Sequence, residues 1–436
     1  MIFVEFAVVL LFILIGARMG GIGIGYAGGA GVIVLALLGL PVDPVKGIPW
    51  DVLGIILCVI VCIAAMESAG GLDWLVAVTE KLLRKNPKRI TFLAPMVTYF
   101  MTAFSGTGHV AYSSLPVIAE VAKESGVRPS RPLSISVVAS QVAIVASPIS
   151  AAVVAMTSIV EKAQVDYLQV LAVSLPTTFV GVMVGALVAS RMGVELKDDP
   201  VYQDRLAKGL VKTRDVGVKE IAPHAKRSVA IFAVALLIVI LYSTLTSPKV
   251  GLIEDPTLGR SPAIMTFMFA AGMIIVLTCK VSIGTITSQS TYKGGTSAAI
   301  CILGVAWLGN TFVEAHIDEI KTVGGDVISQ YPWLLAVVLF FASALLYSQG
   351  ATTITLMPVA QGMGVAASTM LASFPAVTGL YLLPTYPTTV AAVEMDSTGT
   401  TRIGKYVFNH PFLLPGVVSV AVAVVLGFGL APMILG

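Results

Sequence analysis

Charged residues are scarce in this sequence. Only 12% of the 436 residues are Asp, Glu, Lys or Arg, whereas 56% are hydrophobic. Soluble domains carry about 25% charged residues, so most of the surface of this chain is expected to face the lipid bilayer. Apolar tracts long enough to cross a bilayer recur from one end of the chain to the other. The composition therefore predicts an all-α polytopic membrane protein with no large soluble domain.

Cysteine and histidine are also scarce, with four residues of each type. Cys58 and Cys62 share one face of an expected helix, but no His or carboxylate accompanies them at the spacing of a metal site. We therefore expect the cysteines to pack in apolar surroundings and the protein to hold no metal or other cofactor. The net charge of +3 gives no indication of a nucleic-acid partner.

Ten segments are apolar and long enough to be membrane spans. They cover residues 2–17, 20–40, 50–71, 132–160, 167–190, 228–247, 261–279, 295–314, 367–395 and 412–434. The N-terminal sequence MIFVEF lacks the basic segment and cleavage site of a signal peptide, so the first of these is expected to be a retained span. Two further apolar tracts, 90–122 and 333–365, are interrupted near their middle by polar and helix-breaking residues.

The basic residues indicate how these two tracts lie in the membrane. If each tract is a re-entrant hairpin, 22 of the 27 lysines and arginines fall on one side, including the run EKLLRKNPKR and the 191–227 loop. The positive-inside rule makes that side cytoplasmic and both termini periplasmic. In the alternative, 90–122 is one span with a glycine kink, and twelve basic residues of 123–131 and 191–227 lie outside.

The length of the first tract favours the hairpin. Ile90 to Ser105 is a helix of ~22 Å, which passes the middle of a ~30 Å hydrocarbon core without crossing it. The second tract has the same layout, because Trp333 to Ser348 precedes the breaker SQGATT. In both tracts a proline follows the breaker, Pro116 and Pro358.

These features predict an inverted repeat. SPISAAVVAM matches YPTTVAAVEM, which aligns Pro148 with Pro387 and Met156 with Met395. Residues 1–190 and 228–436 then form two halves joined by the cytoplasmic 191–227 loop. Each half holds five spans, one of them broken (132–160 and 367–395), and one hairpin (90–122 and 333–365). Five spans per half is an odd number, so the halves have opposite orientations.

The four polar breaks are the candidate site. Non-helical backbone is tolerated at mid-membrane only where protein encloses it or it lines a cavity, and inverted repeats with broken helices are typical of secondary transporters. We expect the breaks to converge on a substrate. The candidate substrate-binding residues are Ser105, Gly106, Thr107, Gly108, His109, Ser147, Pro148, Ser150, Ser348, Gln349, Gly350, Thr352, Thr353, Pro384, Thr385, Pro387, Thr388 and Thr389.

Each of these residue types also has a local interpretation. The Ser and Thr hydroxyls either bind a carboxylate or merely cap a helix and bond a nearby carbonyl at a proline kink. His109 either responds to protons and donates to a carboxylate, or makes a structural hydrogen bond. Glu67 and Glu394 lie near span ends, where snorkelling or cytosol-facing carboxylates are expected.

The candidate segments contain no strong cationic group. Lys and Arg are absent from 90–122, 132–161 and 322–401, so an anionic substrate would depend on hydroxyls, the Gln349 amide and backbone N–H groups at helix N-termini. An anion held without a basic partner favours a co-bound proton or cation such as Na⁺. A neutral polar substrate remains an alternative at this point.

Two other function classes are compatible with part of the pattern. An intramembrane serine hydrolase using Ser105 would need a His on a neighbouring segment, whereas His109 lies four residues away on the same tip. An anion channel would use the same polar lining without saturable exchange. The glycine-rich stretch 20–31 resembles a dinucleotide loop, but Gly21, Gly25 and Gly29 are spaced for close helix packing.

Several long stretches resemble one known family. They are GARMGGIGIGYAGG, GGLDWLVAVTEKLLRKNPKRITFLAPMVTYF, SGTGH, ILGVAWLGNTF and LLPTYPTTVAAVEMDSTGTTRIGKYVFNHPF. They are similar to the anaerobic C4-dicarboxylate transporter (Dcu) family, most closely its DcuA branch, and the resemblance runs from residue 1 to the end.

The resemblance implies a carrier of the bacterial inner membrane that exchanges fumarate, malate or aspartate for succinate. Dicarboxylate uptake coupled to protons or cations is the alternative within the family. Similarity to the wider ion-transporter superfamily implies an elevator-type fold and mechanism, and a homodimer. That superfamily usually has Ser-Asn-Thr at its hairpin tips, whereas the tips here contain SGTGH and SQGATT, so coupling to Na⁺ does not follow directly.

Overall fold

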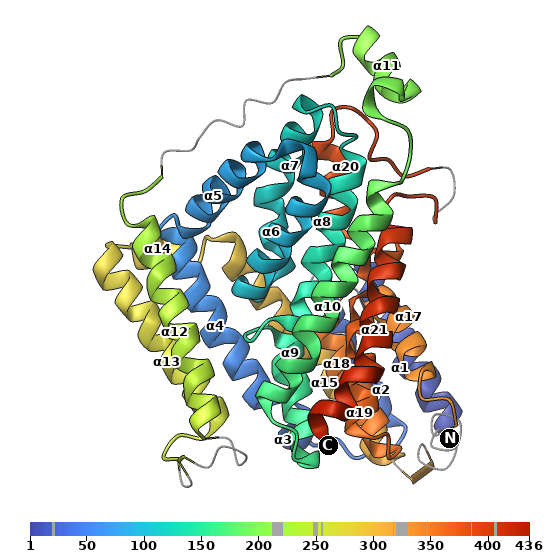
Figure 1. The fold of residues 1–436 in the computed structure, drawn as a ribbon. Coiled ribbons are helices and arrows are strands. Elements are labelled where there is room, and N and C mark those ends of the chain that lie inside the picture. The colour runs from blue at the N-terminus through green and yellow to red at the C-terminus, as the bar shows by residue number, and fades with distance from the viewer. Residues whose placement is uncertain are drawn as a thin grey trace.

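The computed structural model describes all residues except 20–21, 212–220, 247–251, 254–255, 317, 320–329, 347, 385 and 405–407. Within the described residues the chain is helical and forms no strand. Figure 1 shows a bundle in which the N- and C-termini lie at one end and α11 (Pro200–Ala207) lies at the other. We refer to the second as the α11 end.

Seven helical stretches of the described chain are long and apolar enough to cross a membrane, and a bent pair makes an eighth. The seven are α4 (Trp50–Ser68), α8 (Ser130–Val142) with η3 (Ala143–Ala146) and α9 (Ala151–Val160), α10 (Tyr167–Ser190), α12 (Ala225–Leu245), α13 (Arg260–Cys279), α15 (Ser290–Ala315) and α21 (Leu413–Leu435). The bent pair joins α19 (Ala367–Ser373) and η6 (Phe374–Leu382) to α20 (Pro387–Met395) at 51°.

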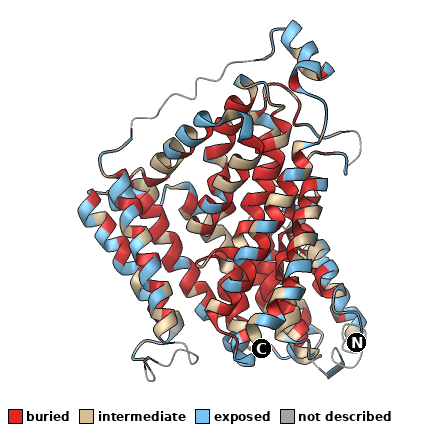
Figure 2. Cartoon of the chain, viewed as in Figure 1, coloured by how far each residue is buried: buried red, intermediate tan, exposed pale blue. Residues whose placement is uncertain are grey.

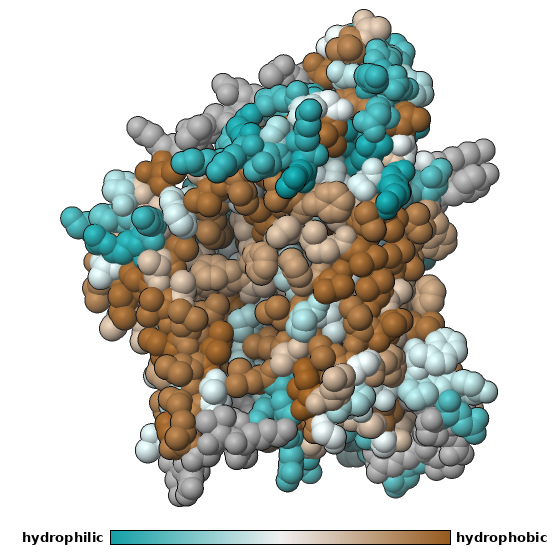
Figure 3. Space-filling model, viewed as in Figure 1, coloured by the Kyte–Doolittle hydropathy of each residue, from teal (hydrophilic) through white to brown (hydrophobic). Residues whose placement is uncertain are grey.

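Two shorter apolar helices, α1 (Ile2–Met19) and α2 (Gly23–Leu37), occupy the first two predicted spans. Apolar helices therefore lie in all ten segments that the sequence indicated. Figure 3 shows the corresponding surface on one face: hydrophobic residues cover its middle, and hydrophilic residues gather towards its two ends. This is the surface expected of a multi-pass membrane protein.

The two interrupted tracts form helix pairs. The first is α6 (Ile90–Ser105) with α7 (Ala111–Glu124), and the second is α17 (Leu334–Leu346) with α18 (Gln349–Gly362). Arg84, at the end of α5 (Gly71–Lys85), forms a 2.6 Å ion pair with Glu124, the last residue of α7. The first tract therefore starts and ends at the same end of the molecule. A single crossing would separate these groups by about 30 Å.

The second pair approaches from the other end. Gln361, near the end of α18, donates to the carbonyl of Ile159 near the end of α9, at 2.7 Å. Figure 1 places α17 and α19 towards the end that carries the termini and α7 towards the α11 end. The turns of both pairs consequently lie deep inside the molecule.

Buried apolar residues divide between two main clusters. One includes Tyr99, Val138 and Phe374 and gathers residues of α6–α10 and α17–α21. The other is built mainly from α4, α12, α13 and α15. We call the first set of helices the core body and the second set, with α1 and α2, the frame body. Figure 2 shows buried residues concentrated in the interior of the bundle and exposed residues along the outer helices.

The four cysteines are buried and none forms a disulfide, as their apolar neighbourhoods predicted. The glycine-rich stretch packs as a helix, and the prediction of a close-packing face is confirmed at Gly25 but not at Gly29. A Cβ on Gly25 would lie 2.4 Å from the carbonyl oxygen of Ile300, and one on Gly28 would lie 2.4 Å from the Gly304 backbone. Gly29 has no neighbour within 4 Å, so its predicted role in packing was wrong, and Gly21 lies outside the described residues.

This packing gives a first testable prediction. Gly28→Ala should destabilise the protein by about 1–3 kcal/mol, because the methyl group has only backbone to displace. Gly29→Ala on the same helix should leave stability unchanged or raise it by about 0.5–1 kcal/mol, since alanine favours helix. Thermal unfolding of the two purified variants in detergent makes the comparison. Equal melting temperatures would contradict the close approach of α2 and α15.

Candidate functional site

A cavity of about 530 Å³ lies between the core body and the frame body. Its core-body wall is formed by the turns of both hairpins and by the breaks between η3 and α9 and between η6 and α20. Its frame-body wall is formed by residues of α2, α4 and α15. Four segments that are far apart in the sequence therefore meet at one place.

The first hairpin turn is built around Gly106. This residue ends α6 with a left-handed backbone (φ 72°), and its N–H donates to the carbonyl of Thr102 at 2.8 Å. A Cβ there would be strained and would lie 3.1 Å from Ile149. The Ser105 hydroxyl donates to the Thr107 carbonyl at 3.2 Å. The turn thus satisfies part of its own backbone while its polar groups remain at the cavity.

His109 projects from this turn to the cavity. Its side chain is exposed, and it is one of the cavity-lining residues. Nδ1 lies 2.9 Å from the hydroxyl of Thr107, and the ring stacks on Tyr112 with centroids 6.0 Å apart. Gly294 of α15 lies opposite, where a Cβ would be 3.6 Å from the imidazole. Nε2 has no protein hydrogen-bond partner among the described residues, which leaves it available to a ligand.

The second hairpin turn presents Ser348, Gln349 and Gly350 to the same cavity. The Ser348 hydroxyl accepts from the N–H of Ala351 at 3.1 Å and so caps α18. A Cβ on Gly350 would lie 3.2 Å from Ala151, the first residue of α9. The close approach places the N-terminal ends of α18 and α9 side by side, and both ends carry partial positive charge.

Gln141 connects three of the four segments. It is fully buried in α8 and its Nε2 donates to Thr388 of α20 at 3.3 Å. Its Oε1 accepts from Nε2 of Gln349 at 3.0 Å, and a Cβ on Gly108 would lie 2.9 Å from its Nε2. A buried amide that bonds the second hairpin turn and the second break, and lies against the first turn, fixes their relative positions.

The structure brings nine of the predicted residues to the cavity. They are Ser105, Gly106, Thr107, Gly108, His109, Ser348, Gln349, Gly350 and Pro387. Eight others are not in its lining: Ser147, Pro148, Ser150, Thr352, Thr353, Pro384, Thr388 and Thr389. Thr385 lies outside the described residues.

Most hydroxyls that do not line the cavity bond backbone nearby, as the local interpretation anticipated, whereas that of Thr388 accepts from Gln141. Ser150 donates to the carbonyl of Ile144 at 2.6 Å and accepts from the N–H of Val153. Thr353 donates to the carbonyl of Gln349 at 2.7 Å. A carbonyl one turn away is always within reach of such a side chain, so these residues complete the hydrogen bonding of the broken helices.

Sequence reasoning missed the frame-body wall. Thr291, Gly294, Gly295 and Ser297 of α15 line the cavity together with isoleucines of α4. The small-residue run KGGTSAA was a usable signal, because small side chains let another element approach closely. Tyr386 was missed too, although it stands between two predicted residues. Gln141 had its own signal, as the only amide side chain in the 132–160 span.

The electrostatics of the cavity come from dipoles. No Lys, Arg, Asp or Glu is among its lining residues in the described chain. Glu67, which was expected to be a snorkelling or cytosol-facing carboxylate, has hydrogen-bond partners on α15. It accepts from the hydroxyl of Ser290 and from the N–H of Thr291 at 3.0 Å, which caps the N-terminus of α15. The remaining polar groups of the cavity are donors and acceptors without formal charge.

A polar cavity enclosed by two helix-turn-helix tips and two broken spans, in a multi-pass helical protein, defines a membrane carrier of the secondary-transporter type. The model of the anaerobic C4-dicarboxylate membrane transporter family matches residues 1–435. The chain belongs to this family, which confirms the resemblance read from the sequence. The family consists of transporters, so the hydrolase alternative is set aside.

Individual proteins agree with this assignment. The chain is 55% identical to the C4-dicarboxylate transporter DcuA of Wolinella succinogenes over 435 residues, and all of both chains is covered. It is also 55% identical to DcuA of Escherichia coli K12 over 436 residues, again with complete coverage. Among solved structures, the YdaH transporter of Alcanivorax borkumensis is similar in fold, with a TM-score of 0.53, 13% identity and coverage of 90% of this chain and 86% of that one.

The amide bridge gives the second prediction. Gln141→Leu and Gln349→Leu should each strongly reduce transport, because either change leaves the partner amide unpaired in a buried place. The double variant should be little less stable than either single variant. A double-mutant cycle on the free energy of unfolding should therefore give a coupling of about 1–3 kcal/mol. Gln361→Leu removes an amide that bonds Ile159 outside the cavity and serves as the matched control. If the losses of unfolding free energy at positions 141 and 349 were additive, the hydrogen bond between the two amides would be contradicted.

Proposed function

We propose that this protein exchanges C4-dicarboxylates across the bacterial inner membrane, most simply fumarate, malate or aspartate on one side for succinate on the other. Family membership supports the substrate class. The single structural observation that carries the proposal is the cavity of about 530 Å³ between the two hairpin turns. It is large enough for a four-carbon diacid with some water, and is polar at the turns and apolar at the α4 wall.

We assign recognition of the two carboxylates to the two turns. The Nε2 atom of His109 offers a donor from the first turn when the Thr107 hydroxyl donates to its Nδ1, while the backbone N–H groups at the N-terminal end of α18 offer donors from the second. The apolar side chains of α4 would contact the carbon chain. This division suits an elongated molecule with negative charge at both ends.

The absence of Lys and Arg from the described lining bears on coupling. Exchange of fumarate or malate for succinate replaces one dianion by another and moves no net charge, so this antiport needs no co-transported cation. Symport would carry a proton or a cation such as Na⁺ together with the dianion. Proton- or cation-coupled uptake is therefore the second candidate function, and His109 is the group placed to take part.

For the mechanism we propose elevator-type alternating access, with the core body moving along the frame body. Both hairpins and both broken spans belong to the core body, so the substrate would travel with them. The facing wall carries Ile56, Val59 and Ile60 of α4 and mostly small residues of α15, a surface with few groups whose directional bonds would resist sliding. The opposite directions of the two hairpins support an inverted repeat, and a homodimer joined through the frame body fits the same scheme.

The exchange assay is the third prediction. Proteoliposomes loaded with unlabelled succinate should take up labelled fumarate, and liposomes without internal dicarboxylate should not. Gly294→Leu places a branched side chain opposite His109 and should lower uptake about tenfold or more by filling the cavity. Gly284→Leu, at a site with no neighbour within 4 Å, is the control.

Three results would count against the proposal. Uptake that ignores internal substrate but follows an imposed proton or Na⁺ gradient would favour the symporter. Large unitary currents would establish a channel. Normal kinetics in Gly294→Leu, with the variant shown to be folded, would place the substrate elsewhere.

Orientation in the membrane is the fourth prediction. We propose that the α11 end is cytoplasmic and that both termini are periplasmic, because the basic residues gather at the α11 end. In a variant lacking the four native cysteines, Cys at position 208 should react with an impermeant maleimide only in inverted vesicles, and Cys at position 162 only from outside. Lys208 and Lys162 are both exposed. The reverse labelling pattern would invert the proposed topology.

A further inference from the structure

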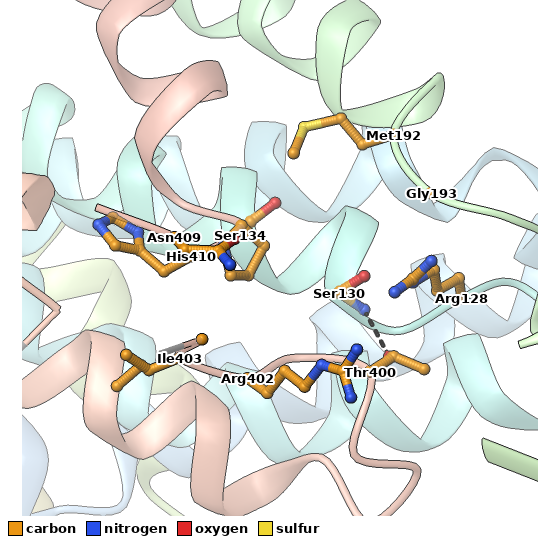
Figure 4. A pocket seen from close by; sticks show the side chains of 12 residues that line it. Arg128, Ser130, Ser134, Met192, Gly193, Thr400, Arg402, Ile403, Asn409 and His410 are labelled. Carbon is orange, nitrogen blue, oxygen red and sulfur yellow. Dashed lines mark hydrogen bonds between the residues drawn. The ribbon is translucent and has the colours of Figure 1, made fainter. Parts of the chain in front are cut away.

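A second cavity, of about 580 Å³, lies at the α11 end, away from the hairpin turns. Figure 4 shows its lining, which comes from three connections of the core body: the segment before and at the start of α8, the segment after α10, and the segment between α20 and α21. It shares no lining residue with the central cavity. The substrate site therefore does not account for it.

The lining is basic. Arg128 and Arg402 both line the cavity, and Figure 4 shows them on either side of Thr400. The other polar groups are neutral side chains, including Ser130, Ser134 and Asn409. No Asp or Glu is among the lining residues in the described chain.

Two carboxylates, Asp199 and Asp396, bond to residues at this basic lining without lining the cavity themselves. Asp199 forms a 2.9 Å ion pair with Nη2 of Arg128 and is 2% exposed. Asp396 accepts from the hydroxyl of Thr400 at 2.9 Å and from the N–H of Thr401 at 2.6 Å. In turn, the Thr400 hydroxyl oxygen accepts from the N–H of Ser130. These bonds hold the wall in place without placing negative charge in the cavity.

The arginines have unused donors. Nε of Arg128 is buried and has no hydrogen-bond partner in the described structure. Only its Nη2 is committed to Asp199, and a guanidinium carries five N–H donors. Arg402 has an exposed side chain and forms no ion pair within the described residues. A buried arginine donor without a partner calls for a bound water or anion.

His410 contributes a further unpaired atom. Its Nε2 lies 3.2 Å from the carbonyl of Leu382, while its buried Nδ1 has no partner among the described residues. Burial lowers the pKa of His410, and the bond to Leu382 opposes that effect. A neutral imidazole that donates through Nε2 offers Nδ1 as an acceptor, which suits a water molecule or a protonated acid group at the edge of the cavity.

We propose that this cavity is a binding site for a small oxyanion, a phosphate or carboxylate group, held between Arg128 and Arg402. Planar guanidinium groups match the oxygen pairs of both anions. A bound oxyanion would link the three connections and so stabilise the α11 end of the core body. The group could come from a free anion or from the phosphate of a lipid headgroup.

The test is thermal unfolding of the full-length protein in nanodiscs of phosphatidylcholine, titrated with inorganic phosphate against sodium chloride of matched ionic strength. Phosphate should raise the melting temperature in a saturable manner, because a ligand that binds only the folded state stabilises it. Arg402→Gln should weaken the response about tenfold or more. Lys208→Gln removes a positive charge at the same end, outside the cavity, and should respond as wild type does.

A second variant addresses Arg128. Arg128→Gln alone would leave the buried carboxylate of Asp199 unpaired, so Arg128→Gln with Asp199→Asn is used, and it too should lose the response to phosphate. If the ligand is a lipid headgroup, phosphatidylglycerol in the nanodisc should raise the melting temperature of the wild type but not of Arg402→Gln. Added phosphate should then have no further effect, because the lipid already occupies the site. Equal responses to phosphate and chloride in both membranes, or an unchanged response in Arg402→Gln, would overturn the proposal.

Discussion

The structure depends on one constraint: backbone that leaves the helix inside a bilayer must find its hydrogen bonds within the protein. The hairpin turns and broken spans meet it with short local bonds, such as those of Gly106 to Thr102 and Ser150 to Ile144. Gln141 then bonds the second turn and the second break, and it packs against Gly108 of the first turn. Because these bonds engage many of the polar groups at the breaks, the groups left unpaired at the central cavity, such as Nε2 of His109, define what that cavity can bind.

The same constraint separates the two bodies. All interrupted helices lie in the core body, where they enclose one another, while α4, α12, α13 and α15 of the frame body run as continuous helices. Their contact surface at the cavity consists mainly of aliphatic and small side chains, with the hydroxyls of Thr291 and Ser297 among them. An interface of this kind keeps its packing when it shifts, because it contains few directional bonds to break. The core body therefore holds an internally hydrogen-bonded site, and the frame body presents a mainly apolar surface to it.

The sequence predicted the elements of this architecture well, since length, hydropathy and helix breakers act locally. Apolar helices occupy the ten expected segments, and nine of the eighteen candidate residues line the cavity. The misses have one physical cause. A hydroxyl such as that of Thr353 can point to a ligand or to a carbonyl one turn away. The local backbone geometry decides between the two, and the residue type does not specify that geometry. The α15 wall and the choice of Gly28 over Gly29 likewise depend on how helices rotate about their axes, which tertiary packing determines.

The central claim is that a diacid sits between the two hairpin turns. A cryo-electron microscopy structure of the protein saturated with succinate tests it most directly. The account predicts density for the ligand within hydrogen-bond distance of His109 or Thr107 at one end and of Gln349 or the start of α18 at the other. Ligand density elsewhere, with the space between the turns occupied only by water, would contradict it.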